Sequence, residues 1–144
     1  MFKLSSTERT SYEDQLLTAL RYSLSFIFIW FGLLKMSGFN PVYDLINSVT
    51  PFLAQSTGLV ILGAFETLIG IGLAFNRFHN LTHLLLLIYL AGTFLVFITG
   101  LDVVFEPHFP ILSLSGEFVI KNIVLIVAGL LILIHELRKK RKSA

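Results

Sequence analysis

The chain has no cysteine, so disulfides, thiol redox chemistry and thiolate metal sites are excluded. Charged residues are scarce, at 14%, whereas 55% of the residues are hydrophobic and the mean hydropathy is +0.81. One core in a soluble domain of 144 residues cannot hide that much apolar surface. We therefore expect an integral membrane protein, folded as one compact unit without a Gly/Ser-rich or Pro-rich linker.

Long apolar runs separated by polar segments predict four membrane-spanning helices. They lie at about residues 16–36, 57–75, 81–101 and 118–137. Residues 76–80 form a tight turn, whereas the two other connections are long. This pattern predicts an all-α, up-down-up-down four-helix membrane bundle over residues 16–137. Residues 1–15 and the basic residues 138–144 flank it.

Several local signals refine these boundaries. Ser11 and Asp14 have capping-box spacing and predict the start of the first helix. Asn40-Pro41 predicts a short helix at 41–49 whose apolar residues share one side, so it should lie on the membrane surface. Two prolines within residues 106–110 predict an irregular second loop.

The distribution of basic residues predicts the orientation in the membrane. Loops 37–56 and 102–117 contain no Lys or Arg, whereas Lys3, Arg9, Arg77 and residues 138–142 would all lie on the opposite side. The positive-inside rule then places both termini in the cytoplasm. The basic tail should contact anionic lipids. Nucleic-acid binding is not expected without a soluble domain.

Glu66 is the one charged residue in the apolar run 57–75. A carboxylate inside a membrane is costly, so it marks a functional-site hypothesis with a partner to be found. Counting the rise per residue, Glu66 and Thr93 both lie roughly 12 to 14 Å below the outer surface, and Lys121 and Asn122 about 5 Å below it. Lys35 ends the first span from the same side.

Helical spacing puts small and polar residues on shared stripes, which would let the helices approach closely. The stripes hold Arg21, Ser25, Gly32 and Lys35; Gly63, Glu66, Thr67, Gly70 and Ala74; and Tyr89, Thr93, Val96 and Gly100. Arg21 and Lys35 lie shallow enough to extend toward the headgroups. The predicted polar cluster inside the bundle comprises Lys35, Glu66, Thr93, Lys121, Asn122 and Trp30, although Trp30 also suits a lipid-facing position.

This cluster has three interpretations. One carboxylate against two lysines leaves surplus positive charge, which would suit a small anion or a quinone-like headgroup. Glu66 would alternatively accept protons in a transport cycle. In the third interpretation, Glu66 pairs with Lys35 or Lys121 only to neutralise charge and fix the helix register.

The histidines do not suggest a metal or haem site. His79 and His83 flank the inner turn, where headgroup contact is expected, His108 lies in the outer loop and His135 at the inner end of the last span. No histidine is expected at mid-depth, so neither haem nor a structural metal is predicted. Phosphate loops, serine elbows and paired catalytic carboxylates are also absent from the sequence.

Four motifs in order carry a family resemblance. They are Gly32-Leu33-Leu34-Lys35, residues 66–70 (ETLIG), Gly92-Thr93-Phe94 and residues 116–122 (GEFVIKN). Together they make residues 21–133 resemble the DoxX-like family of small bacterial membrane proteins. The resemblance implies a four-helix protein of the bacterial inner membrane, with recurrent polar positions at Lys35, Glu66, Lys121 and Asn122. Family members look like subunits or relatives of thiosulfate:quinone oxidoreductase, or are linked to oxidative and reactive-chlorine stress.

The expected function is therefore that of an accessory subunit in a quinone-linked or oxidative-stress redox system. It would have an outward-facing polar pocket, possible use of a quinone, and no catalytic activity of its own. Its partners would be the bilayer, a redox-enzyme subunit or further copies of the chain. A small proton-coupled transporter or exporter using Glu66, and a purely structural scaffold, are the alternatives.

Overall fold

The computed structural model describes residues 6–40, 43–76 and 78–143. Over these residues the chain is helical apart from turns and an isolated antiparallel bridge between Phe105 and Leu112. The helices are α1 (Ser6–Met36), α2 (Tyr43–Val49), α3 (Ser56–Phe75), α4 (His79–Thr93), α5 (Val96–Thr99), α6 (Leu101–Val104) and α7 (Leu114–Ser143).

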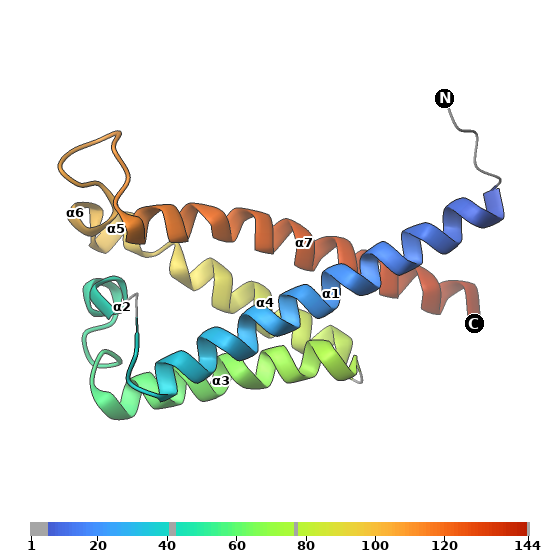
Figure 1. The fold of residues 1–144 in the computed structure, drawn as a ribbon, viewed down its shortest axis with the longest axis horizontal. Coiled ribbons are helices and arrows are strands. Elements are labelled where there is room, and N and C mark those ends of the chain that lie inside the picture. Colours follow the sequence, from blue (N-terminus) through green and yellow to red (C-terminus); the bar gives the residue numbers. More distant parts are fainter. Residues whose placement is uncertain (1–5, 41–42, 77, 144) are drawn as a thin grey trace.

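Four segments are long and apolar enough to cross a membrane, namely Ser11–Met36, Ser56–Phe75, Asn80–Thr99 and Leu114–Lys139. The predicted all-α four-helix membrane bundle is confirmed. Figure 1 shows the amino end of α1 and the carboxyl end of α7 at one end of the molecule, and α2, α5 and α6 at the other. We call the end formed by α2, α5 and α6 the loop end.

The closest helix pair is α1 with α3, and glycine makes that approach possible. A Cβ added at Gly63 would lie 2.5 Å from Gly32 O, and one at Gly70 would lie 2.8 Å from Ile29 N. Ser25 Oγ donates a hydrogen bond to Gly70 O at 2.7 Å. The predicted stripes of small residues on the first and second spans therefore do meet, with the two backbones almost in contact.

Two apolar clusters hold the bundle together. The first draws buried side chains from all four long helices: Leu24, Phe28, Ile69, Leu73, Leu86, Leu90, Ala128 and Ile132. The second lies at the loop end and consists of Leu45, Val96, Val104 and Val119. Because Leu45 belongs to this second cluster, α2 packs against the bundle at the loop end.

The third span is interrupted, whereas the sequence predicted one helix over 81–101. After Thr93 the backbone tightens, because Phe94 N–H bonds to Ala91 O and Leu95 N–H to Gly92 O, each spanning three residues rather than four. The Thr93 hydroxyl donates to Leu90 O at 2.6 Å, a local bond that competes with regular helix.

Helix ends also differ from the prediction. The first helix begins at Ser6 rather than Ser11. The last begins at Leu114 because Ser113 caps it, its Oγ accepting a hydrogen bond from Gly116 N–H at 3.0 Å. The short helix is confirmed over Tyr43–Val49. Its predicted start at Pro41, Lys3 of the amino segment and Arg77 of the inner turn lie outside the described residues.

Candidate functional site

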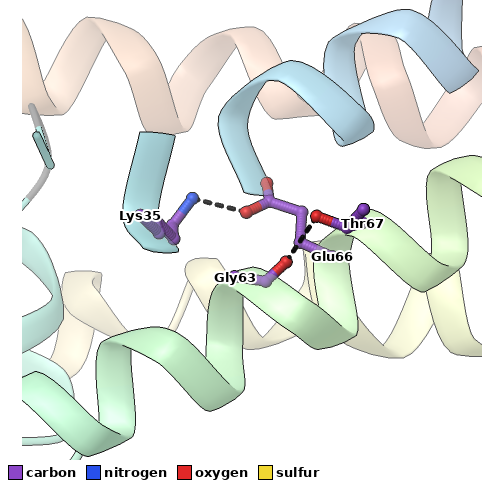
Figure 2. Close-up of polar contacts among 4 residues, drawn as sticks. All are labelled: Lys35, Gly63, Glu66 and Thr67. Atoms are coloured by element: carbon purple, nitrogen blue, oxygen red, sulfur yellow. Dashed lines mark hydrogen bonds and ion pairs between the residues drawn. The ribbon is translucent and has the colours of Figure 1, made fainter. Parts of the chain in front are cut away.

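A buried ion pair joins α1 to α3. Lys35 Nζ lies 2.6 Å from Glu66 Oε2, and the exposed fractions of the two side chains are 5% and 8%. Figure 2 shows the Lys35 ammonium and the Glu66 carboxylate pointing toward each other between the two helices. The predicted partner of Glu66 is therefore Lys35. Thr67, next to Glu66, donates its hydroxyl hydrogen to Gly63 O in its own helix at 2.8 Å (Figure 2).

Tyr89 of α4 adds a third group to the pair. Its side chain borders the same cavity as Lys35 and Glu66. The ring is held by edge contact with Phe28 and tilted contact with Phe65, at centroid distances of 5.9 and 6.3 Å. Tyr89 was on a predicted polar stripe, but it was not predicted to be a site residue. By the rise per residue, the Tyr89 backbone lies about 6 Å deeper than that of Thr93, and the length of its side chain spans that difference.

Asn122 and Thr93 form a second polar pair, between α7 and α4. Asn122 Nδ2 donates to Thr93 Oγ1 at 2.9 Å, and Asn122 is buried. Both residues were predicted members of the polar cluster, and the structure brings them together. Because Thr93 Oγ1 also donates to Leu90 O, this pair has a fixed donor direction.

Both pairs border one cavity of about 70 Å³, which we call the polar cavity. It lies between the two apolar clusters, since Phe28 and Leu90 of the first and Leu45 of the second help to line it. Its walls are Ile27, Phe28, Phe31, Lys35, Leu45, Ile46, Glu66, Tyr89, Leu90, Thr93, Phe118, Asn122 and Leu125. A cavity of this size, with polar groups on its walls, has room for a few water molecules or a small polar group.

No protein-family model, curated protein or solved structure matches the chain. The function is therefore inferred from the geometry of the polar cavity and its surroundings.

Lys121 does not belong to the cluster, and its predicted position was wrong. Its side chain is 72% exposed, and it pairs with Glu117 one turn away at 3.5 Å. Neighbouring residues on a helix point about 100° apart, so burying Asn122 turns Lys121 outward. Of the two lysines expected beside Glu66, Lys35 lies next to it and Lys121 does not. The predicted surplus of positive charge at Glu66 is therefore not present.

Trp30 also lies outside the cluster. It is 55% exposed and stacks on Phe26, one turn earlier, with 5.8 Å between ring centroids. Lys35 lies five positions further along α1, so the two side chains point about 140° apart around the helix axis. When Lys35 faces α3, Trp30 therefore faces outward, which agrees with the lipid-facing alternative.

Two residues predicted near the headgroups are buried. Arg21 Nη1 donates to Leu73 O at 2.5 Å and Ala74 O at 2.8 Å, so its guanidinium caps the carboxyl end of α3. His83 is fully buried in α4 rather than exposed at the turn. From its shallow position in the first span, Arg21 was predicted to extend toward the lipid headgroups. Instead its guanidinium reaches backbone carbonyls at the end of α3 that have no partner within the helix.

The end of the bundle opposite the loop end carries a separate polar contact. His135 Nε2 lies 3.0 Å from Asp14 Oδ1, joining α7 to α1. Within the described residues, no group of three or more His, Asp and Glu side chains has an arrangement that would hold a metal ion.

Proposed function

We propose that this chain is a DoxX-like subunit of the bacterial inner membrane, accessory to a quinone-linked or oxidative-stress redox system. In this proposal the polar cavity binds the hydrogen-bonding end of a neutral, lipid-soluble ligand of the quinone class. The chain itself supplies binding and position, and a partner subunit supplies the electron transfer. Both termini lie in the cytoplasm, as the distribution of basic residues predicts.

One observation supports this function best: polar groups from all four long helices converge on a single cavity in the apolar interior. Lys35, Glu66, Tyr89, Thr93 and Asn122 all line it. Intramembrane ionisable residues are costly and usually mark functional sites. Convergence from α1, α3, α4 and α7 is more than a single helix-to-helix contact requires.

The donors in the polar cavity suit a carbonyl oxygen. The Lys35 ammonium has three N–H donors, of which one points to Glu66 Oε2. The Asn122 amide nitrogen has two, of which one points to Thr93. The remaining hydrogens are directed donors in an apolar surrounding, where each hydrogen bond is stronger than in water.

The charge balance favours a neutral ligand over an oxyanion. Lys35 and Glu66 neutralise each other at 2.6 Å, and Lys121 faces outward. An anion would therefore meet no net positive charge and would lie close to a carboxylate. A quinone carbonyl needs donors and no counter-charge.

Affinity purification from native membranes, followed by extraction of small molecules and identification of co-purifying proteins, tests the proposal. We expect a quinone and an oxidoreductase subunit to accompany the wild-type chain. The Lys35→Met/Glu66→Leu variant keeps an apolar filling while removing both charges, and should lose the quinone. Lys121→Met, which removes an exposed lysine, should retain it. Recovery of neither a quinone nor a redox subunit with the wild type would reject the function.

Proton-coupled transport is the second candidate, favoured by the position of Glu66. Glu66 pairs with Lys35 and lines the same cavity as Tyr89 inside the bundle, and intramembrane carboxylates take part in the proton relays of pumps and transporters. Under this function, Glu66→Gln would abolish substrate movement into vesicles when transport is expressed per amount of folded protein, a normalisation needed because the variant also leaves the buried Lys35 ammonium without a counter-charge. Glu117→Gln, at an exposed carboxylate, is the matched control and should transport normally.

A further inference from the structure

A larger hollow lies beside the polar cavity, and we call it the lipid-side groove. Its volume is about 320 Å³. It runs between α2, the connection after α2, α3 and α4, and is lined by Leu45, Ile46, Val49, Thr50, Leu53, Leu62, Phe65, Ile88, Tyr89, Gly92, Thr93 and Leu95. It shares Leu45, Ile46, Tyr89 and Thr93 with the polar cavity, so these side chains form a common wall.

The groove is apolar except at that wall. Thr50 bonds to Ile46 O in its own helix, which removes its hydroxyl from the surface presented to a ligand. Ile88 and Phe65 are exposed on the membrane-spanning helices α4 and α3. A hollow with such walls, on the outer surface of a spanning bundle, faces hydrocarbon rather than water.

Gly92 lines the base of the groove, where its missing side chain leaves open space. A Cβ added there would meet no atom within 4 Å. At Gly63 and Gly70, by contrast, the added atom would collide with the neighbouring helix. The space above Gly92 is therefore not consumed by helix packing and belongs to the groove.

Volume decides where the body of a ligand would lie. An apolar cavity of about 150 Å³ is known to hold a benzene ring. The polar cavity, at about 70 Å³, is too small for a ring, whereas the groove, at about 320 Å³, is large enough. Typical ligand pockets begin at about 300 Å³.

We infer that the lipid-side groove binds, by access from the bilayer, the ring and chain of a quinone-class lipid whose polar oxygen faces Tyr89 at the common wall, since the Thr93 hydroxyl already donates to Leu90 O. The inference depends on the proposed function for the ligand class and adds its place and its route. Glu66 lines the polar cavity but not the groove. Tyr89 lines both spaces and would therefore lie between the bound oxygen and the buried ion pair.

Photo-crosslinking tests this site. The probe is an azido-benzoquinone with a decyl chain, added to the full-length protein in lipid nanodiscs, with adducts located by mass spectrometry. We expect adducts on the peptides of α2 and α4 that carry groove residues. Gly92→Leu fills the base of the groove and should lower the adduct yield about tenfold, equivalent to one decade of affinity. Ala91→Leu places the same side chain at an exposed neighbour outside the groove and should leave the yield unchanged.

Competition separates specific binding from ordinary lipid contact. Unlabelled decyl-benzoquinone should displace the probe, and decanol should not. Equal displacement by decanol would show that the groove holds only annular lipid chains, and would overturn the inference. An unchanged melting temperature for Gly92→Leu confirms that lost labelling does not reflect unfolding.

The two proposals fail in different ways. If a quinone co-purifies with the wild type but the probe labels no groove peptide, the groove inference is wrong and the proposed function stands. If the probe labels the groove but labelling is unaffected in Lys35→Met/Glu66→Leu, the groove binds the lipid without the polar cavity, and the role of the ion pair in binding is wrong.

Discussion

Lys35 Nζ and Glu66 Oε2 lie 2.6 Å apart and join the carboxyl end of α1 to the middle of α3. Around them the two helices are in backbone contact at Gly32 and Gly63. The pair is therefore formed between two closely packed helices, and both side chains are largely shielded from bulk solvent. Each charge depends on the other for compensation.

Breaking this pair on one side should be much worse than removing it entirely. Glu66→Gln leaves the buried Lys35 ammonium without a counter-charge and should reduce the free energy of unfolding by about 3–5 kcal/mol. Lys35→Met/Glu66→Leu should cost about 1 kcal/mol or less, since a well-packed apolar replacement avoids the desolvation of both charges. Reversible unfolding in mixed micelles measures both values.

The exposed pair Lys121–Glu117 is the control for that measurement. Its groups are 3.5 Å apart and largely exposed, so Lys121→Met should change stability by no more than about 1 kcal/mol. A double variant at Lys35 and Glu66 that is as unstable as the single variant would contradict the interpretation of the pair as mutually compensating charges.

Glycines that look alike in the sequence should respond oppositely to alanine. At Gly70 the new Cβ would lie 2.7 Å from Ile29 Cγ1 and 2.9 Å from Ser25 O, so Gly70→Ala should destabilise the bundle by about 1–3 kcal/mol. At Gly92 nothing lies within 4 Å, so Gly92→Ala should be neutral or stabilising by up to about 1 kcal/mol through helix propensity. Thermal melting of both variants decides; similar losses at the two sites would refute the close packing of α1 on α3.

This difference shows what the sequence could and could not predict. Span positions follow from hydropathy, and the meeting of α1 with α3 follows from the spacing of Gly32, Gly63 and Gly70, because small residues repeat on one helical face. Gly92 lies in a similar pattern but faces open space. Which glycine is in contact depends on helix rotation about its axis, and a single sequence carries only weak information about that rotation.

The candidate site was predictable to the same degree. Depth alone placed Glu66 and Thr93 at one level and Asn122 nearer the outer surface, and the structure brings all three to one cavity together with Lys35 and Tyr89. Depth could not separate Asn122 from Lys121, which are adjacent in the chain but point in different directions on α7. Errors of this kind arise because depth is a coordinate along the helix, whereas burial depends on the angle around it.

Arg21 should stabilise the carboxyl end of α3. Its guanidinium donates to Leu73 O and Ala74 O, where helical carbonyls have no partner in the following turn. Arg21→Met should therefore cost about 1.5–3 kcal/mol, the usual range for hydrogen bonds to a charged group. Arg21→Lys keeps the charge but cannot reproduce the planar donor geometry, so it should recover only part of the loss. Full recovery with lysine would show that charge near the helix end, rather than the two hydrogen bonds, provides the stabilisation.

The absence of cysteine makes the membrane orientation directly measurable. Asn47 is exposed on α2, and Asn80 is exposed near the start of α4; the 20-residue helix α3 separates these two ends of the bundle by about 30 Å. A membrane-impermeant maleimide applied to intact bacterial cells should label Asn47→Cys but not Asn80→Cys, because the distribution of basic residues predicts that the α3–α4 turn and both termini lie in the cytoplasm. Inverted vesicles should give the opposite result, and the cysteine-free parent chain provides the blank. Labelling of Asn80→Cys alone in intact cells would reverse the orientation. It would also turn the loop end, with its polar cavity and lipid-side groove, toward the cytoplasmic leaflet.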